Sequence, residues 1–201
     1  MNTLLHYRRR WRELRQNPVI DTIVWLAIAI AVILVGQEYV VKPYKVPSES
    51  MERTLLIGDR ILAARFWYRF NDPKRGEVIV FHPNGKGDGE PFRTTTSVSN
   101  RVFVKRLIGL PGDTLRFENQ KLQICTGPAG AGCRSYPEPY VASSSSDLDH
   151  YETTVPKGCY FMMGDNRGSS NDSRYWGCIK KSQMLGRAFS IYWPLTRIRF
   201  F

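Results

Sequence analysis

The chain has 201 residues, a length that predicts one domain with room for a small insertion. Hydrophobic residues make up 42% and charged residues 23%, a balance that excludes a disordered chain and a membrane protein with many spans. The 29 Lys and Arg against 18 Asp and Glu give a net charge of +11, so nucleic acid and an anionic membrane surface are candidate partners.

The first 41 residues combine a basic start with an apolar run. Five arginines and one glutamate fall within residues 1–20, and sixteen uncharged, mostly apolar residues separate Asp21 from Glu38. As a helix, 19–41 would measure about 34 Å, against about 30 Å for the hydrocarbon core of a bilayer. Because the arginines precede the run, we predict a cytoplasmic N-terminus at 1–18, a transmembrane helix at 19–41 and an extracytoplasmic domain at 42–201.

A cleavable secretory signal is the alternative interpretation of this region, because small residues occur at Ala27, Ala29 and Ala31. These alanines lie in the middle of the apolar run, and apolar residues continue beyond them. An uncleaved, single-pass anchor in the plasma (inner) membrane is therefore the favoured prediction.

The four cysteines agree with an extracytoplasmic domain, where disulfides form. Cys125 and Cys133 flank a loop rich in Gly, Pro and Ala, a spacing that suits a disulfide, and Cys159 and Cys178 are a possible second pair. Zinc is discounted, because no Cys-x-x-Cys spacing occurs. Nucleotide-binding and His-Glu-x-x-His motifs are also absent from the sequence, so neither a metal nor a cofactor is expected.

Beyond residue 41 the sequence predicts strands rather than helices, because short apolar or alternating runs are separated by turn residues. Two polar stretches, at about 83–99 and within about 119–155, are predicted to be loops or an insertion in a mostly β domain. The expected strands are 77–81, 100–110, 114–117, 121–124, 160–163, 186–193 and 197–201.

Ser50 lies in the first of three segments whose composition suggests chemistry, Pro-Ser-Glu-Ser-Met at 47–51. Nine extended residues reach at most about 30 Å, so Ser50 would act close to the bilayer surface. Two hydroxyls on either side of Glu49 suit a nucleophile with a neighbouring donor, although this composition is also common in turns.

Lys105 lies in the second segment, the predicted strand around 102–108. On a strand it shares a face with Phe103 and Leu107, and apolar neighbours would lower its pKa towards the range of a general base. The alternative is a lysine whose ammonium reaches the solvent along its flexible stem.

The third segment, 164–174, is dense in turn-forming residues and in opposite charges, with Asp172 between Arg167 and Arg174. An ordinary surface loop has this composition too. A rigid, hydrogen-bonded loop beside an active site would use it to supply a hydroxyl that orients a base.

In their order along the chain, and behind the apolar run, three motifs together resemble bacterial type I signal peptidase. They are Pro-Ser-x-Ser-Met, Lys-Arg-Leu-Ile-Gly-Leu-Pro-Gly-Asp and Gly-Asp-Asn-Arg-x-x-Ser-x-Asp-Ser-Arg. The resemblance covers about residues 20–193, apart from the two polar stretches. It implies a mostly β catalytic domain with a small inserted β subdomain, and a membrane-anchored serine endopeptidase that removes signal peptides from exported preproteins at Ala-x-Ala-like sites.

The resemblance also implies the role of individual residues. Ser50 would be the nucleophile and Lys105 the general base, Ser48 would stabilise the oxyanion, and Ser170 would orient the lysine amine. Structural support of the site would come from Asp165, Arg167, Asp172 and Arg174. The shallow pockets for small substrate residues would be lined by Tyr44, Val46, Pro47, Met51, Leu55, Phe103 and Val104.

The sequence departs from the pattern of this family at Arg53. The family usually has Ser-Met-x-Pro-Thr-Leu after the nucleophile, and the loss of proline removes a fixed φ. We therefore expect the segment behind Ser50 to be less rigid, with lower activity or altered specificity as the consequence.

Two partners are expected: an anionic lipid surface, and preproteins that carry signal peptides. The aromatic cluster at 66–70 would either contact the membrane or form part of the core. Nucleic acid is not expected, and the chain is expected to be a monomer. Arg53 motivates one alternative, a scaffold that binds signal peptides without cleaving them, but the intact Ser50 and Lys105 argue against it. A second alternative is a self-cleaving Ser–Lys repressor. It would carry an N-terminal helix-turn-helix, and the apolar run at this place argues against it.

Overall fold

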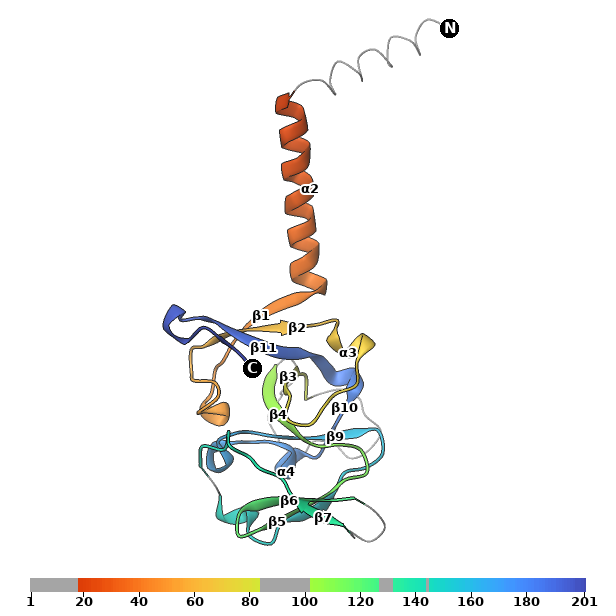
Figure 1. The fold of residues 1–201 in the computed structure, drawn as a ribbon, viewed down its shortest axis with the longest axis vertical. Helices are drawn as coiled ribbons and strands as arrows, with labels where there is room; N and C mark the ends of the chain where they lie inside the picture. Colours follow the sequence, from red (N-terminus) through yellow and green to blue (C-terminus); the bar gives the residue numbers. More distant parts are fainter. Residues whose placement is uncertain (1–17, 84–101, 127–131, 144) are drawn as a thin grey trace, which may run out of the picture. The chain divides into compact units, whose positions relative to one another are not determined.

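The computed structural model describes residues 18–83, 102–126, 132–143 and 145–201, and the chain divides into two compact units, 1–41 and 42–201. In the first unit, Pro18–Tyr39 forms helix α2 (Figure 1). Among the residues described, no helix combines the length and the apolar character needed to cross a membrane. The predicted transmembrane helix at 19–41 is therefore not confirmed. The helix ends at Tyr39, and strand β1 (Val41–Lys45) begins two residues later.

The second unit is mostly β, as predicted (Figure 1). Its described residues form an eight-stranded sheet of order β1-β2-β11-β3-β4-β9-β10, with β12 paired to β11, and a four-stranded sheet of order β7-β6-β5-β8. The strands after β1 are β2 (Arg60–Ala64), β3 (Val78–Phe81), β4 (Phe103–Gly109), β5 (Thr114–Glu118), β6 (Lys121–Cys125), β7 (Cys133–Ser135), β8 (Glu152–Thr154), β9 (Cys159–Met163), β10 (Ile179–Lys180), β11 (Met184–Trp193) and β12 (Arg199–Phe200). Two four-residue helices, α3 (Trp67–Phe70) and α4 (Ser173–Trp176), and five 3₁₀ turns connect them: η1 (Glu49–Met51), η3 (Ser146–Leu148), η4 (Arg167–Ser169), η5 (Lys181–Gln183) and η6 (Leu195–Arg197).

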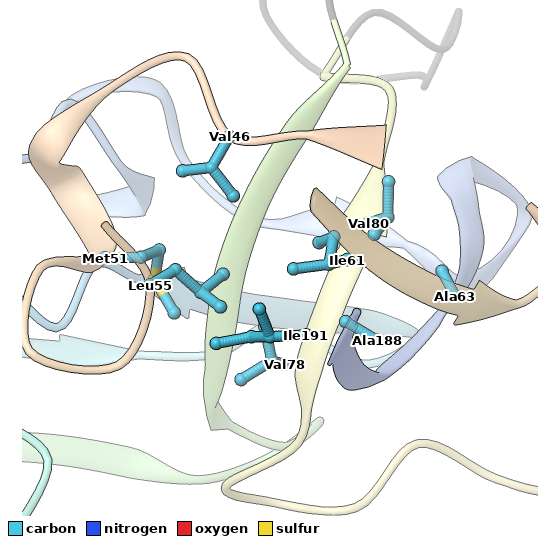
Figure 2. Close-up of a cluster of buried hydrophobic side chains, with 9 residues drawn as sticks. All are labelled: Val46, Met51, Leu55, Ile61, Ala63, Val78, Val80, Ala188 and Ile191. Carbon is cyan, nitrogen blue, oxygen red and sulfur yellow. The ribbon is translucent and has the colours of Figure 1, made fainter. Parts of the chain in front are cut away.

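The larger sheet is buried on both faces at its centre. On β3, Val78 and Val80 belong to one apolar cluster, shown in Figure 2, whereas Ile79 and Phe81 belong to another. Because successive strand residues point to opposite faces, an uninterrupted apolar run is what a strand covered on both sides requires. This arrangement gives β4, the neighbour of β3, a dry environment.

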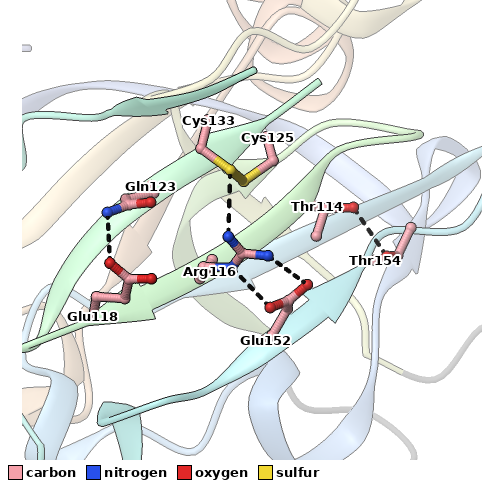
Figure 3. Close-up of a disulfide and its surroundings, with 8 residues drawn as sticks. All are labelled: Thr114, Arg116, Glu118, Gln123, Cys125, Cys133, Glu152 and Thr154. Atoms are coloured by element: carbon pink, nitrogen blue, oxygen red, sulfur yellow. Dashed lines mark hydrogen bonds and ion pairs between the residues drawn. A yellow bond between two sulfur atoms is a disulfide. The ribbon is translucent and has the colours of Figure 1, made fainter. Parts of the chain in front are cut away.

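The smaller sheet packs on the larger one through a third apolar cluster, which joins Ile108 of β4 and Phe161 of β9 to Leu115 and Phe117 of β5. Along the chain, the smaller sheet begins with β5 at Thr114, before the predicted start of the insertion at residue 119. Figure 3 shows the Cys125–Cys133 disulfide, which connects β6 to β7.

All seven expected strands are present, with ends that differ by up to three residues in the part of the chain that the structure describes. The sequence missed β1, β2, β7, β8 and β10, of which β7 and β8 lie in the stretch expected to form loops. These two strands have three residues each, which is too short to show a periodic pattern, and they form because neighbouring strands of the sheet pair with them. The other polar stretch, at about 83–99, lies from residue 84 onwards outside the described residues. Both predicted disulfides, Cys125–Cys133 and Cys159–Cys178, are present.

Candidate active site

Ser50 lies at the centre of the 3₁₀ turn η1, which follows β1 closely along the chain. Met51 is 1% exposed and anchors this turn in the core, while the Glu52 N–H donates to the Glu49 carbonyl at 2.8 Å. Ser50 itself is buried, and its Oγ is 3.3 Å from the Oγ of Ser48. The two hydroxyls of the first motif therefore lie together, one buried and one exposed.

Lys105 lies on β4, opposite Ile79 of β3, and only 2% of the residue is exposed. This burial excludes the alternative of an ammonium that reaches the solvent. Desolvation lowers the pKa of Lys105 from 10.5 to about 8; the Asp172 carboxylate opposes this shift and the Arg174 guanidinium adds to it. An amine with this pKa is partly neutral near pH 7, as a general base must be.

Gly164 lies where the three predicted segments meet. Continuing the antiparallel register of β4 and β9 by one residue brings Gly164 opposite Lys105. A Cβ atom at Gly164 would clash with the Ser170 Oγ and with the Ser50 carbonyl oxygen. Two groups are thus packed against this glycine: the hydroxyl of Ser170, and the turn in which Ser50 lies.

Asp172 organises the loop after β9 from a fully buried position. Its carboxylate accepts hydrogen bonds from the Gly164 N–H at 3.0 Å, from the Ser170 Oγ at 2.7 Å and from the Arg174 Nε at 2.8 Å. It also caps α4 by accepting from the Arg174 N–H. Because the Ser170 proton is donated to Asp172, the lone pairs of the Ser170 oxygen are free to accept a hydrogen bond from an amine.

Asp165 binds the residue next to Lys105. The Nε and Nη2 of Arg106 donate to its two carboxylate oxygens at 2.8 and 2.6 Å, and the Thr54 hydroxyl donates to Oδ2 at 2.5 Å. These bonds connect β4 and the loop after β9 to the segment behind Ser50. Arg106 and Thr54 had no predicted role, although Arg106 lies within the second motif and Thr54 lies directly behind the first.

Arg167 is buried and pairs with Glu138 rather than with Asp172. Its two Nη atoms bind the two Glu138 carboxylate oxygens, and its Nε donates to the Gly164 carbonyl at 3.0 Å. Of the two arginines that flank Asp172 in the sequence, Arg174 binds its carboxylate and Arg167 binds Glu138. Glu138 was missed since it is 29 residues away in the chain, and no local pattern connects the two.

The residues expected to line substrate pockets divide into two groups. Val46, Met51 and Leu55 are at most 2% exposed and belong to the apolar cluster of Figure 2. The others are at least partly exposed and are Tyr44, Pro47, Phe103 and Val104. Phe103 packs in the cluster on the other face of the sheet, where it stacks on Phe81. The seven residues therefore do not all line one surface of the sheet.

A cavity of about 350 Å³ lies elsewhere, at the start of β3, and no predicted site residue lines it. Its lining is Lys74, Arg75, Gly76, Glu77, Val78, Arg106, Arg187, Ala188 and Phe201. Within the described ranges, no group of three or more His, Cys, Asp and Glu side chains is arranged to hold a metal ion.

Comparison with known proteins shows the family of the chain. Residues 19–193 match the family described as signal peptidase, peptidase S26. The chain belongs to this family. It is 36% identical over 188 residues to a probable signal peptidase I-2 from Synechocystis sp., with 94% of this chain and 76% of that protein covered. It is 32% identical to a signal peptidase I from Leptolyngbya laminosa, with 90% and 83% covered.

Among solved structures, a signal peptidase I from Enterococcus faecalis shares 29% identity, with a TM-score of 0.43, 58% of this chain and 97% of that chain covered. As a member of the S26 family, the present chain is a serine peptidase, a hydrolase of peptide bonds.

Proposed function

We propose that the chain removes signal peptides from exported preproteins with a catalytic dyad of Ser50 and Lys105. The observation that carries this proposal is the burial of Lys105, which is 2% exposed, on the strand that η1 contacts. Desolvation at this position lowers the pKa of the Lys105 amine. A neutral Lys105 amine accepts the proton of the Ser50 hydroxyl as Oγ attacks the scissile carbonyl. The resulting ammonium returns the proton to the leaving amine, and a water molecule activated in the same way hydrolyses the acyl-enzyme.

The other predicted hydroxyls serve the same steps. Ser48, whose Oγ is 3.3 Å from the Ser50 Oγ, donates together with the Ser50 N–H to the tetrahedral oxyanion. Ser170 donates its own proton to Asp172 and accepts from the Lys105 amine, which fixes the direction of the amine lone pair. Both reacting groups come from one chain, so a monomer suffices.

We also propose that the substrate carries small residues before the scissile bond, as in Ala-x-Ala. With Val46, Met51 and Leu55 closed into the core and Phe103 packed on the other face of the sheet, the surface of Tyr44, Pro47 and Val104 leaves little depth for a large side chain. An extended peptide would lie on this surface as an added strand.

Cleavage of a preprotein with an Ala-x-Ala site by the full-length protein in detergent tests the dyad. The wild type is expected to cut after the second alanine, whereas Ser50→Ala and Lys105→Met are inactive. Ser135→Ala and Lys121→Met, at exposed positions of the smaller sheet, are matched controls that retain activity. Cleavage by Lys105→Met would overturn the assignment of the base, and an intact substrate with the wild type would overturn the proposed function.

We further infer that the N-terminal region attaches the chain to the plasma membrane, with residues 1–18 in the cytoplasm and 42–201 outside. Apolar side chains of α2 are exposed, with Trp25 at 70% and Leu34 at 60%, and five arginines precede them. Two disulfides in the second unit suit an oxidising compartment. Exposed Phe66 and Phe70 would contact anionic lipid beside basic residues.

Protease protection in spheroplasts, combined with carbonate extraction, tests this topology. Protease added outside should remove the second unit, and carbonate should leave the chain in the membrane fraction. Release by carbonate would contradict the attachment, and protection of 42–201 would contradict the orientation.

A further inference from the structure

Arg53 adopts a backbone conformation that the usual residue of its family cannot adopt. Its φ is 78°, in the left-handed region that non-glycine residues rarely occupy. Proline holds φ near −65°, so it is incompatible with this turn. The loop behind Ser50 therefore has a backbone of its own in this chain, and the loss of proline calls for another restraint.

The guanidinium of Arg53 supplies a contact that spans 88 residues of sequence. Its Nη1 donates to the Val141 carbonyl oxygen at 2.9 Å. Val141 lies in segment 138–143, which enters the site from the inserted region between β7 and η3. Arg53 is exposed, so the bond forms at the surface, over the turn rather than within the core.

Segment 138–143 is itself fastened to the loop after β9. The Ala142 N–H donates to the Asp165 carbonyl at 2.9 Å, and the Ser143 Oγ donates to the Asn166 Oδ1 at 2.5 Å. The Arg167 N–H donates to the Ser143 carbonyl at 3.1 Å. Each residue from 165 to 167 is thus bonded to this segment, which the buried Arg167–Glu138 ion pair also anchors at its start.

The same loop holds the turn of the nucleophile from its other side. The Asn166 N–H donates to the Ser50 carbonyl at 3.1 Å, and its Nδ2 to the Glu49 carbonyl at 3.3 Å. The hydrogen bonds form a closed circuit, which runs from Ser50 through Asn166 and segment 138–143 to Val141, and returns through Arg53.

We propose that Arg53 is a positioning residue, which closes this circuit and so holds the Ser50 turn against the loop that surrounds Lys105. The proposal rests on the function proposed above. Without the guanidinium, the turn keeps its bonds to Asn166 but loses its link to segment 138–143, and the Ser50 Oγ samples more orientations. Since no substrate atom is involved, the loss appears in kcat rather than in KM.

The test compares Arg53→Ala with Arg53→Gly by steady-state cleavage of a preprotein with an Ala-x-Ala site, using the full chain in detergent. Both variants lose the hydrogen bond, but glycine also relieves the strain of a positive φ, so the pair separates the side chain from the backbone. Arg134→Ala, at an exposed position of β7, is the control for the loss of an arginine. Thermal unfolding of each variant reports whether the fold is retained, and glycine at this φ is not expected to lower the melting temperature.

Both Arg53 variants are expected to lose roughly three- to tenfold in kcat with KM unchanged, as for one hydrogen bond lost from a partly solvated site, and Arg134→Ala to match the wild type. Wild-type kcat in Arg53→Gly would overturn the proposal, because the side chain would then be dispensable. A rise in KM at constant kcat would also overturn it, by showing that Arg53 contacts substrate. An inactive wild type would instead refute the proposed function itself, and the two failures are distinguishable.

Discussion

Replacing Lys105 with methionine should abolish cleavage and at the same time stabilise the fold near neutral pH. The pKa of Lys105 is about 8 in the folded chain, against 10.5 for an unperturbed lysine in the unfolded chain. Between these values the unfolded state binds more protons, so the free energy of unfolding of the wild type rises as the pH increases from 8 to 10.5. The difference between the two pKa values corresponds to about 3 kcal/mol. Below pH 8 the free energy of unfolding is lower by this amount, because the folded state then buries an ammonium group.

Urea unfolding of the full chain in detergent, followed by circular dichroism at pH 7 and pH 10, measures this contribution. From pH 7 to pH 10 the free energy of unfolding of the wild type should increase by about 2 to 3 kcal/mol relative to Lys105→Met, because methionine does not titrate. Lys121→Met, on the exposed side of β6, should show no such difference from the wild type. Parallel pH dependences for the wild type and Lys105→Met would refute the reasoning that burial depresses this pKa.

Further predictions concern the pH profile, Gly164, Asp172 and the second disulfide. In the wild type, kcat/KM should rise with pH and level off above about 8, as Lys105 loses its proton; a flat profile would argue against a lysine base. Gly164→Ala should cost about 1–3 kcal/mol in urea unfolding and abolish cleavage, because the added methyl group clashes with the Ser50 carbonyl; wild-type activity would contradict this packing. Asp172→Asn should lower the free energy of unfolding, measured with urea, by about 3–5 kcal/mol, since the buried Arg174 guanidinium then lacks the carboxylate that it pairs with. A loss below 1 kcal/mol would show that water reaches this guanidinium. Replacing both cysteines of the Cys159–Cys178 disulfide with serine should lower the free energy of unfolding in urea by about 3 kcal/mol in the loop-entropy model. An unchanged free energy of unfolding would contradict this contribution.

Local patterns were sufficient for the elements whose residues carry their own signal. The apolar run of β3, and the apolar residues on either side of Lys105 and Arg106 in β4, predicted two central strands, because a strand covered on both faces needs apolar side chains on both. The spacing of Cys125 and Cys133 predicted their disulfide, since a short loop brings the two sulfur atoms within reach. Strands of two or three residues, such as β7, β8 and β10, carry no such signal and exist only because a longer neighbour offers hydrogen bonds.

The sequence by itself determined which residues are candidates for chemistry, because nucleophile, amine and hydroxyl are properties of residue types and the motifs that hold them are local. Only the tertiary structure decided their state. The pKa of Lys105 depends on a burial that β3, β9 and the loop after β9 produce together, and the partner of Arg167 proved to be Glu138, from a distant segment. The left-handed conformation of Arg53 and its bond to Val141 are likewise set by the packing of segments far apart in the chain. Desolvation and ion pairing depend on distance in space, which short-range sequence patterns do not encode.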